Sequence, residues 1–477
     1  MKTNRFRTTS ILTLSLAWTG LACYLFSIIR GLGKDTALPF FDPGDIFSDF
    51  FKLIASYPGR HEIQLESWLP GLFSNIINGY LNSNPYSNNP DASISSLTNF
   101  HLTPVTQIIN VTTRYLFDKV GPGMSLGIHF GIIFVFIGYL VSIASRRRPL
   151  SIQAILLSGC CIILYPSIFT ILRGYSIAYL VNLLVCCSFL IAVRPNSPPW
   201  LPVFILSLAI GIRPNYILFL PLVITVNFCL RPIHAKASQV ARAGVVTILS
   251  LFAAFLLATT LYKNYTINTF LNAYKFYSNA YEYDGTDNFW SSSLLQPLLI
   301  LNKILAKITG IQIILPYQLK LICLGLSLVI CLWSCIQLYK RKISFSKAIL
   351  ACCLGIILGT PVFADYHLLI LLAPVFVSIY CERNVYYDLK ESNDTIIASQ
   401  SEELGLKTPR LYYQILSKTD GFIIIFLIVP KVLPIAVNLG SMQTFLNPLA
   451  ICIYLYLTIH KPMLKSLKTN NAINKLQ

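Results

Sequence analysis

The chain has 477 residues, of which 55% are hydrophobic and only 12% are charged, about half the charged share of ordinary soluble domains. Uncharged runs of membrane-spanning length recur from residue 9 to residue 460, which excludes an assembly of soluble domains. The net charge of +18 does not indicate nucleic-acid binding, because the basic residues are scattered among the loops between apolar runs, as in integral membrane proteins.

Twelve apolar runs predict an all-α polytopic membrane protein. Of the 37 Lys and Arg residues, 23 fall in segments on the side of the N-terminus and 12 on the opposite side. The positive-inside rule therefore predicts a multi-pass protein of the plasma (inner) membrane with both termini in the cytoplasm. The predicted spans are residues 9–29, 124–144, 150–172, 174–193, 200–212, 214–230, 244–262, 319–338, 347–363, 367–381, 420–437 and 445–460.

The spacing of the runs divides the chain into three parts. Residues 1–381 would form a transmembrane catalytic module with two large outer loops, over residues 30–123 and 263–318. Residues 382–419 are polar and predict a cytoplasmic linker, and residues 420–477 add a C-terminal transmembrane pair with a basic tail. Twelve of the thirteen cysteines lie inside apolar runs, without disulfide or metal-ligand spacing, so they are interpreted as packing residues and no metal is expected.

The first outer loop begins with a predicted amphipathic helix over residues 43–57 that would lie on the membrane surface. Asp42 is suited to the N-cap, Pro43 to the first helical position, and Asp45 to the first turn, where a carboxylate favours the helix dipole. Asp49 has no such structural duty, and its like-charged neighbour Asp45 at i−4 costs a few tenths of a kcal/mol. We therefore expect Asp49 to have a chemical role.

Two further amphipathic helices are expected in this loop, over residues 68–81 and 101–117, the second beginning near Pro104. A polar turn between them contains Tyr86. These surface helices would cover a cavity at the outer rim of the membrane, and Tyr86 either lines that cavity or only contacts solvent above it.

Charged residues interrupt the apolar pattern at further places that the predicted topology puts on the outer side. Arg173 lies at a turn between two runs. Arg213 follows a run of only 13 residues, about 20 Å of helix against a hydrocarbon core of about 30 Å. Either the bilayer is thinned there, or Arg213 and the neighbouring Asn215 face a polar cavity below the surface.

Two more polar interruptions occur later in the chain. Asp365, Tyr366 and His367 are consecutive polar residues before a late span. Lys431 lies between Pro430 and Pro434 in the outer half of its predicted span, where snorkelling to the interface is the simpler interpretation and phosphate binding the alternative. An acid, several cations and a histidine at one membrane depth suit chemistry on a lipid phosphate, since the cations would stabilise the departing phosphate and the carboxylate would deprotonate an acceptor hydroxyl.

Four segments also resemble a known group of enzymes: SDFFKLIASY after the first span, RGYSIAYLVNLL, RPNYILFLPLVI and, more weakly, PVFADYHLLILLAP. Together with the span layout of residues 1–380 they resemble the GT-C glycosyltransferases, and within these the polyprenol-phosphate-mannose-dependent transferases of glycosyltransferase family 87. The first segment is similar to the outer-loop acid of that family, the second to its Arg-Gly-polar turn, and the third to its basic-Pro motif.

The resemblance implies a GT-C fold and an inverting transfer of mannose, or of another hexose or pentose, from a polyprenyl-phosphate donor to a lipid-linked or glycan acceptor at the outer, periplasmic face. It implies no cofactor. Asp49 would be the general base, with Asp45 as second choice. The expected donor-phosphate ligands are Arg173, Arg213, His367 and Lys431, and the expected cavity residues are Asp365, Tyr366, Tyr86 and Asn215.

Two other functions stay open. A lipid or sugar transporter with the same number of spans usually has repeats and helices broken at the bilayer midplane, whereas the charges here gather at the outer rim. An outer-face polysaccharide polymerase or ligase shares the rim arginines but tends to have its large loop late in the chain. The absence of an inside domain for a nucleotide sugar favours a donor from the membrane.

Overall fold

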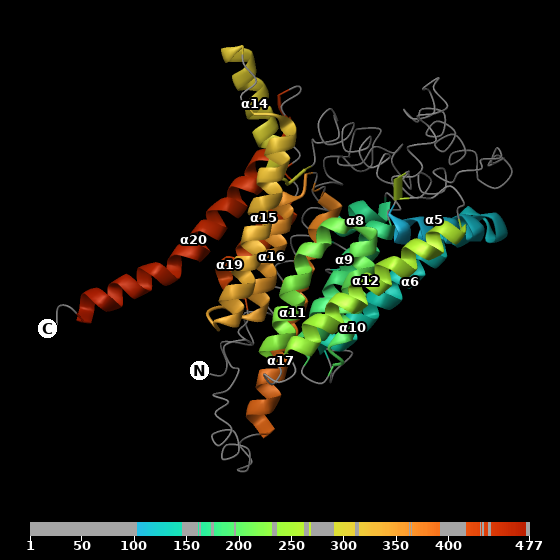
Figure 1. Cartoon of the computed structure of the whole chain (residues 1–477), viewed down its shortest axis with the longest axis horizontal. Helices are drawn as coiled ribbons and strands as arrows, with labels where there is room; N and C mark the ends of the chain where they lie inside the picture. Colours follow the sequence, from blue (N-terminus) through green and yellow to red (C-terminus); the bar gives the residue numbers. More distant parts are fainter. Residues whose placement is uncertain are drawn as a thin grey trace, which may run out of the picture.

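The structure is a computed structural model and describes residues 103–145, 161, 164–172, 176–194, 197–230, 236–261, 267–268, 291–310, 314–361, 363, 365–391, 416–429, 431, 434–436 and 440–473. This part of the chain is a bundle of helices with one short pair of antiparallel strands (Figure 1). Its elements in chain order are α5 (Pro104–Val120), α6 (Pro122–Ser145), α8 (Tyr165–Leu172), α9 (Ser176–Ala192), α10 (Trp200–Ile212), η3 (Pro214–Phe219), α11 (Leu220–Cys229), α12 (Lys236–Leu261), α14 (Leu295–Thr309), α15 (Pro316–Tyr339), α16 (Phe345–Gly359), η7 (Asp365–Leu371), α17 (Leu372–Glu391), α19 (Lys418–Ile428), β1 (Pro434–Ala436), β2 (Gly440–Ser441) and α20 (Met442–Ile473).

Within the described residues, three helical segments are long and apolar enough to cross a membrane: Gly123–Ala144, Pro316–Tyr339 and Met442–Ile459. The same part of the chain contains six shorter apolar helices of 10–17 residues. Large apolar side chains on the outside of the bundle are uncovered, for example Val135 on α6, Ile248 on α12 and Val329 on α15, which are 75%, 68% and 62% exposed. Such a surface suits lipid rather than water, as in helical membrane proteins. The twelve spans and the GT-C arrangement stay predictions.

The bundle has two ends, and the polar contacts of the upper end in Figure 1 join segments that are distant in sequence. The Thr103 hydroxyl donates to the Ile212 carbonyl over 3.3 Å, so the start of α5 lies beside the end of α10. The Ser292 amide donates to the Phe363 carbonyl over 2.9 Å, and the Asn447 side chain on α20 donates to the Ser292 hydroxyl over 2.9 Å. These contacts satisfy irregular backbone at the ends of the helices.

The lower end is fastened by a buried carboxylate. Asp420, at the start of α19, accepts a hydrogen bond from the Ser417 amide over 2.8 Å and another from the Tyr454 hydroxyl on α20. The ammonium of Lys347 on α16 lies 3.8 Å from the same carboxylate. Three helices are thereby joined at this end.

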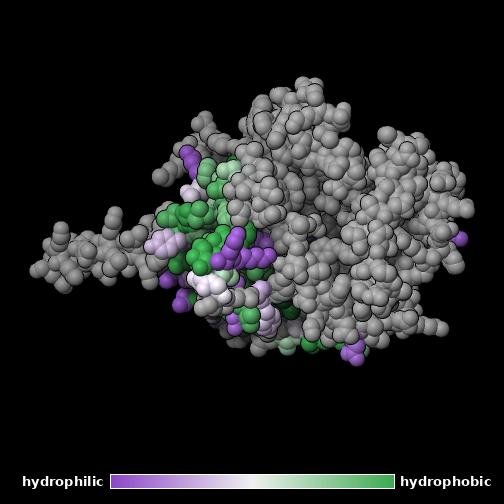
Figure 2. Space-filling view, turned by 90° about the horizontal axis from the view of Figure 1, so that it is seen from above, coloured by the Kyte–Doolittle hydropathy of each residue, from purple (hydrophilic) through white to green (hydrophobic). Residues whose placement is uncertain are grey.

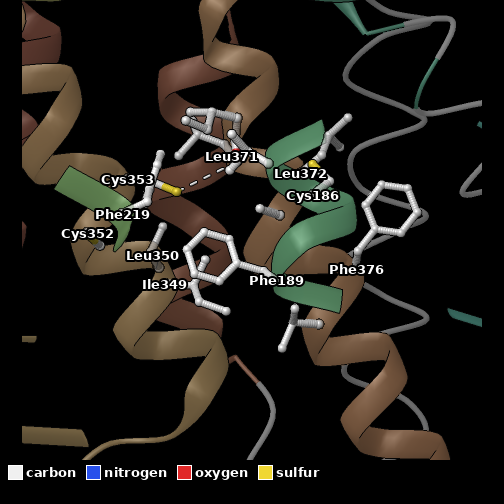
Figure 3. Packing of buried hydrophobic residues seen from close by; sticks show 14 of the residues in the cluster. Cys186, Phe189, Phe219, Ile349, Leu350, Cys352, Cys353, Leu371, Leu372 and Phe376 are labelled. Carbon is white, nitrogen blue, oxygen red and sulfur yellow. Dashed lines mark hydrogen bonds between the residues drawn. The ribbon is translucent and has the colours of Figure 1, made fainter. Parts of the chain in front are cut away.

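Buried aromatic and thiol side chains fill the centre of the bundle (Figure 3). The rings of Phe189 on α9 and Phe219 on η3 meet edge to face, with centroids 5.3 Å apart. Cys186, Cys352 and Cys353 pack around them, each with no exposed surface. These cysteines are packing residues of the core, as the sequence predicts.

Most predicted spans agree with described helices, but three regions differ. The run over residues 420–437 is not one helix, because α19 ends at Ile428 and β1 and β2 form an antiparallel pair beyond it. Proline removes a backbone donor and clashes with the preceding turn, so Pro430 and Pro434 explain the break. The second outer loop, 263–318, contains a helix that the sequence analysis did not predict, α14, and the first turn of α15. The predicted linker over residues 382–419 is helical at its start, because α17 continues to Glu391. Of the run over residues 150–172, residues 150–160, 162 and 163 lie outside the described residues.

Small residues let α15 and α16 approach closely. Gly355 and Gly359 are one turn apart on α16, in the spacing of a small-residue packing motif. A Cβ atom added to Gly359 would lie 2.3 Å from the Ser327 Cβ and 2.6 Å from the Cys323 carbonyl oxygen, both on α15. The Cys323 carbonyl oxygen belongs to the backbone, so it cannot rotate away as a side chain can. We call the face formed by Cys323, Ser327, Gly355 and Gly359 the α15–α16 seam.

We expect Gly359→Ala to destabilise the protein by about 1–3 kcal/mol, because the new methyl group would overpack the α15–α16 seam. The matched control is Gly325→Ala on α15, where an added Cβ meets nothing within 4 Å. There the better helix propensity of alanine acts alone, so stability should stay equal or rise slightly. Thermal unfolding of the purified proteins in detergent measures both changes. Equal midpoints for the two variants would contradict the close packing.

Candidate functional site

The local sequence around Arg213 forces a break between two helices. α10 ends at Ile212, and Arg213 is extended, with φ −133° and ψ 95°. The ring of a proline disfavours helical geometry in the residue before it, which explains why the break falls at Arg213 and why η3 begins at Pro214. The Arg213 amide still donates to the Ala209 carbonyl over 2.8 Å. Arg213 therefore leaves the end of α10 from a defined backbone position.

The guanidinium of Arg213 lies over two aromatic rings. Its Cζ atom is 6.0 Å from the centroid of the Tyr216 ring and 5.8 Å from that of the Phe363 ring. These cation–π contacts stabilise the guanidinium, and the Tyr216 hydroxyl also lies within its reach. The Nη1 atom is buried and has no hydrogen-bond partner among the residues that the structure describes. A buried donor of this kind is costly unless a ligand meets it.

His367 belongs to the same group. It lies on η7, is buried with 2% of its surface exposed, and its ring centroid is 5.6 Å from that of Phe363. The His367 ring and the Arg213 guanidinium therefore both lie against the Phe363 ring. The structure thus brings together Arg213 and His367, two of the residues expected to bind the donor phosphate. We call Arg213, Tyr216, Phe363 and His367 the Arg213 cluster.

Neighbouring segments hold both aromatic rings of this cluster. The Tyr216 hydroxyl donates to the Asn182 Oδ1 atom on α9 over 2.9 Å, and both residues are buried. The Phe363 amide donates to the Ser291 hydroxyl over 3.0 Å. Sequence reasoning missed these supports. Asn182 could have been noticed as a lone amide within an apolar run, whereas nothing near Phe363 in the sequence points to Arg213.

Lys431 contacts the end of α19. Its ammonium donates to the carbonyls of Phe426 and, over 2.8 Å, of Val429, and lies 4.2 Å from the centroid of the Phe426 ring. A cation on the last carbonyls of a helix complements the negative end of the helix dipole. Lys431 therefore caps the end of α19.

The remaining predicted residues differ in what can be said of them. Asn215 is half-buried on η3, between Arg213 and Tyr216. Asp365 and Tyr366 are the first two residues of η7, whose backbone leads into His367. The predicted residues outside the described part of the chain are Asp45, Asp49, Tyr86 and Arg173.

The predicted surface helix over residues 101–117 is confirmed as a helix, α5, and it lies across the upper end of the bundle (Figure 1). The Thr113 hydroxyl is 2.9 Å from the His129 Nε2 atom on α6, which fixes the middle of α5. At its start, the Val105 side chain lies close above Gly211 on α10. The start of α5 therefore contacts the last residues of α10, directly before Arg213.

The upper surface near α14 has a mixed character. Ile304, Leu305 and Ile308 are exposed there beside Lys303 and Lys307. Viewed from above, hydrophobic and hydrophilic side chains alternate over this part of the molecule (Figure 2). The surface is therefore neither a purely lipid-facing face nor a basic patch.

The Arg213 cluster can bind an anion. A guanidinium whose buried Nη1 donor has no partner among the described residues attracts a phosphate oxygen strongly, because little water competes for that donor. Among the described residues, no three His, Cys, Asp or Glu side chains are arranged to hold a metal ion. No family model, curated protein or solved structure matches this chain.

Proposed function

We propose that this chain is an integral membrane glycosyltransferase that uses a polyprenyl-phosphate sugar as donor and acts at the outer face of the membrane. The observation that carries the proposal is the buried Nη1 atom of Arg213, held over two aromatic rings without a hydrogen-bond partner among the described residues. A phosphate ester would supply the missing acceptor, and its isoprenoid chain would suit the surrounding lipid. The site lies where one helix ends and the next begins, at the upper end of the bundle.

In this proposal the Arg213 guanidinium holds the phosphate of the donor and stabilises the negative charge that develops as the sugar–oxygen bond breaks. His367 is a neighbouring phosphate ligand. Asp49, as general base, removes the proton from the acceptor hydroxyl, and the attack on the opposite face of the sugar inverts its anomeric centre. The acceptor is a lipid-linked or glycan hydroxyl, and the products are the glycosylated acceptor and the polyprenyl phosphate.

A transfer assay on the purified protein tests the proposal. The protein, in lipid nanodiscs with a membrane lipid extract as acceptor source, is given a panel of radiolabelled polyprenyl-phosphate sugars and, in parallel, the matching nucleotide sugars. We expect label to move from at least one polyprenyl-phosphate sugar to a new product, and none to move from the nucleotide sugars. Uptake of label into liposomes without a new glycosidic bond would support a transporter instead.

A further inference from the structure

We propose that Asn182 and Tyr216 are positioning residues that fix the Arg213 guanidinium for an isoprenoid phosphate. This inference rests on the proposed function, because it assigns the support of the same anion site. The two residues come from the segments RGYSIAYLVNLL and RPNYILFLPLVI, which are separate in sequence. In the structure one hydrogen bond joins them, from the Tyr216 hydroxyl to the Asn182 Oδ1 atom over 2.9 Å.

The Asn182 amide is itself fixed in one orientation. Its Nδ2 atom donates to the Ala178 carbonyl, one turn earlier on α9, over 2.7 Å. The Oδ1 atom is consequently turned toward Tyr216 as an acceptor. Both side chains are buried, with 1% and 0% of their surfaces exposed, so water does not compete for this hydrogen bond. A buried amide–hydroxyl pair in an apolar bundle is costly to leave incomplete, which makes the ring position well defined.

The Tyr216 ring transmits this position to the cation. The ring is packed edge to face against Phe219, with centroids 5.6 Å apart, and the Arg213 guanidinium lies over it. Phe363, the second ring under the guanidinium, is held independently through Ser291 and Ser292. With both rings fixed, the in-plane donors of Arg213 keep one direction before a ligand arrives. Such preorganisation favours binding, because the ligand does not have to order the side chain.

The experiment is a double-mutant cycle on ligand binding. The affinity for farnesyl phosphate, an isoprenoid monophosphate, is measured for the wild type, Tyr216→Phe, Arg213→Ala and the double variant in detergent. Tyr216→Phe keeps the ring and removes the hydroxyl, which donates to Asn182 and lies beside the Arg213 guanidinium, so we expect affinity to fall about three- to tenfold. In the Arg213→Ala background the same change should have no further effect. Asn182→Ala should lower affinity as Tyr216→Phe does, and combining these two should cost no more than either alone.

Controls separate positioning from a general loss of structure. Tyr454→Phe removes a hydroxyl that donates to Asp420 at the lower end, so it should lower thermal stability and leave farnesyl phosphate binding unchanged. Farnesol, which lacks the phosphate, should bind all variants equally. If Arg213→Ala leaves affinity unchanged, the phosphate site of the proposed function is wrong. If Arg213→Ala lowers affinity but Tyr216→Phe does not, or lowers it equally in both backgrounds, the positioning role alone is wrong.

Discussion

Arg213→Ala is expected to reduce sugar transfer from a polyprenyl-phosphate donor by about ten- to a hundredfold. The loss of a charged, buried hydrogen-bonding partner costs about 1.5–3 kcal/mol, and here the partner would be the donor phosphate. Arg213→Lys should recover only part of the rate, because an ammonium lacks the planar fork that binds two phosphate oxygens and also sits less well over two rings. The measurement is the transfer rate at several donor concentrations.

The control for this variant is Arg194→Ala. Arg194 also follows the end of a helix and is also half-buried, but it lies at the turn between α9 and α10, at the opposite end of α10 from Arg213. It should transfer sugar at the normal rate. A normal rate for Arg213→Ala as well, with folding intact, would remove the observation on which the proposed function rests.

Asp49→Asn is expected to abolish transfer almost completely, by about 10²–10⁴-fold, while insertion into the membrane and thermal stability stay normal. A general base contributes a factor of this size, and its loss lowers turnover rather than donor binding. Asparagine keeps the shape of the side chain and most of its hydrogen-bonding capacity but removes the charge. Asp49 lies outside the described residues, so this prediction depends on the sequence pattern of residues 43–57.

Neighbouring carboxylates supply the comparison. Asp42→Asn should be mild, because asparagine caps a helix about as well as aspartate. If Asp45→Asn abolishes transfer and Asp49→Asn does not, the choice of base on this helix is wrong. If neither substitution matters, the proposed transferase lacks its acid–base chemistry. Turnover and farnesyl phosphate affinity, measured on the same preparations, distinguish these cases.

The sequence predicts the helices of the bundle well where a single physical signal decides them. Mean apolarity over about 20 residues identifies α6, α15 and α20, and the predicted run over residues 200–212 has the bounds of α10. The signal fails where charge or proline divides it. Lys303 and Lys307 interrupt the apolar pattern of α14, which therefore reads as part of a loop, and Pro430 and Pro434 end a run that hydropathy alone continues.

The candidate site is predictable only in part, for a related reason. Arg213 and His367 can be found because a charged or polar residue stands out within an apolar run. Phe363 and Ser291 cannot, because their contact joins residues 72 positions apart and neither is unusual in its own segment. Lys431 illustrates a second limit of the sequence: it stands out as a cation, but the sequence does not show that the carbonyls at the end of α19 are within reach of its ammonium.

The α15–α16 seam has a consequence for the motions available to this protein. Because Ser327 and the Cys323 carbonyl of α15 leave no room for a side chain at Gly359 of α16, sliding the two helices past each other would break this close fit. Packed interfaces of this kind move as rigid bodies rather than deforming gradually. We therefore expect α15 and α16 to move together as one rigid unit. In the proposed function, a polyprenyl chain that enters from the side would pass between other helices of the bundle and not between α15 and α16.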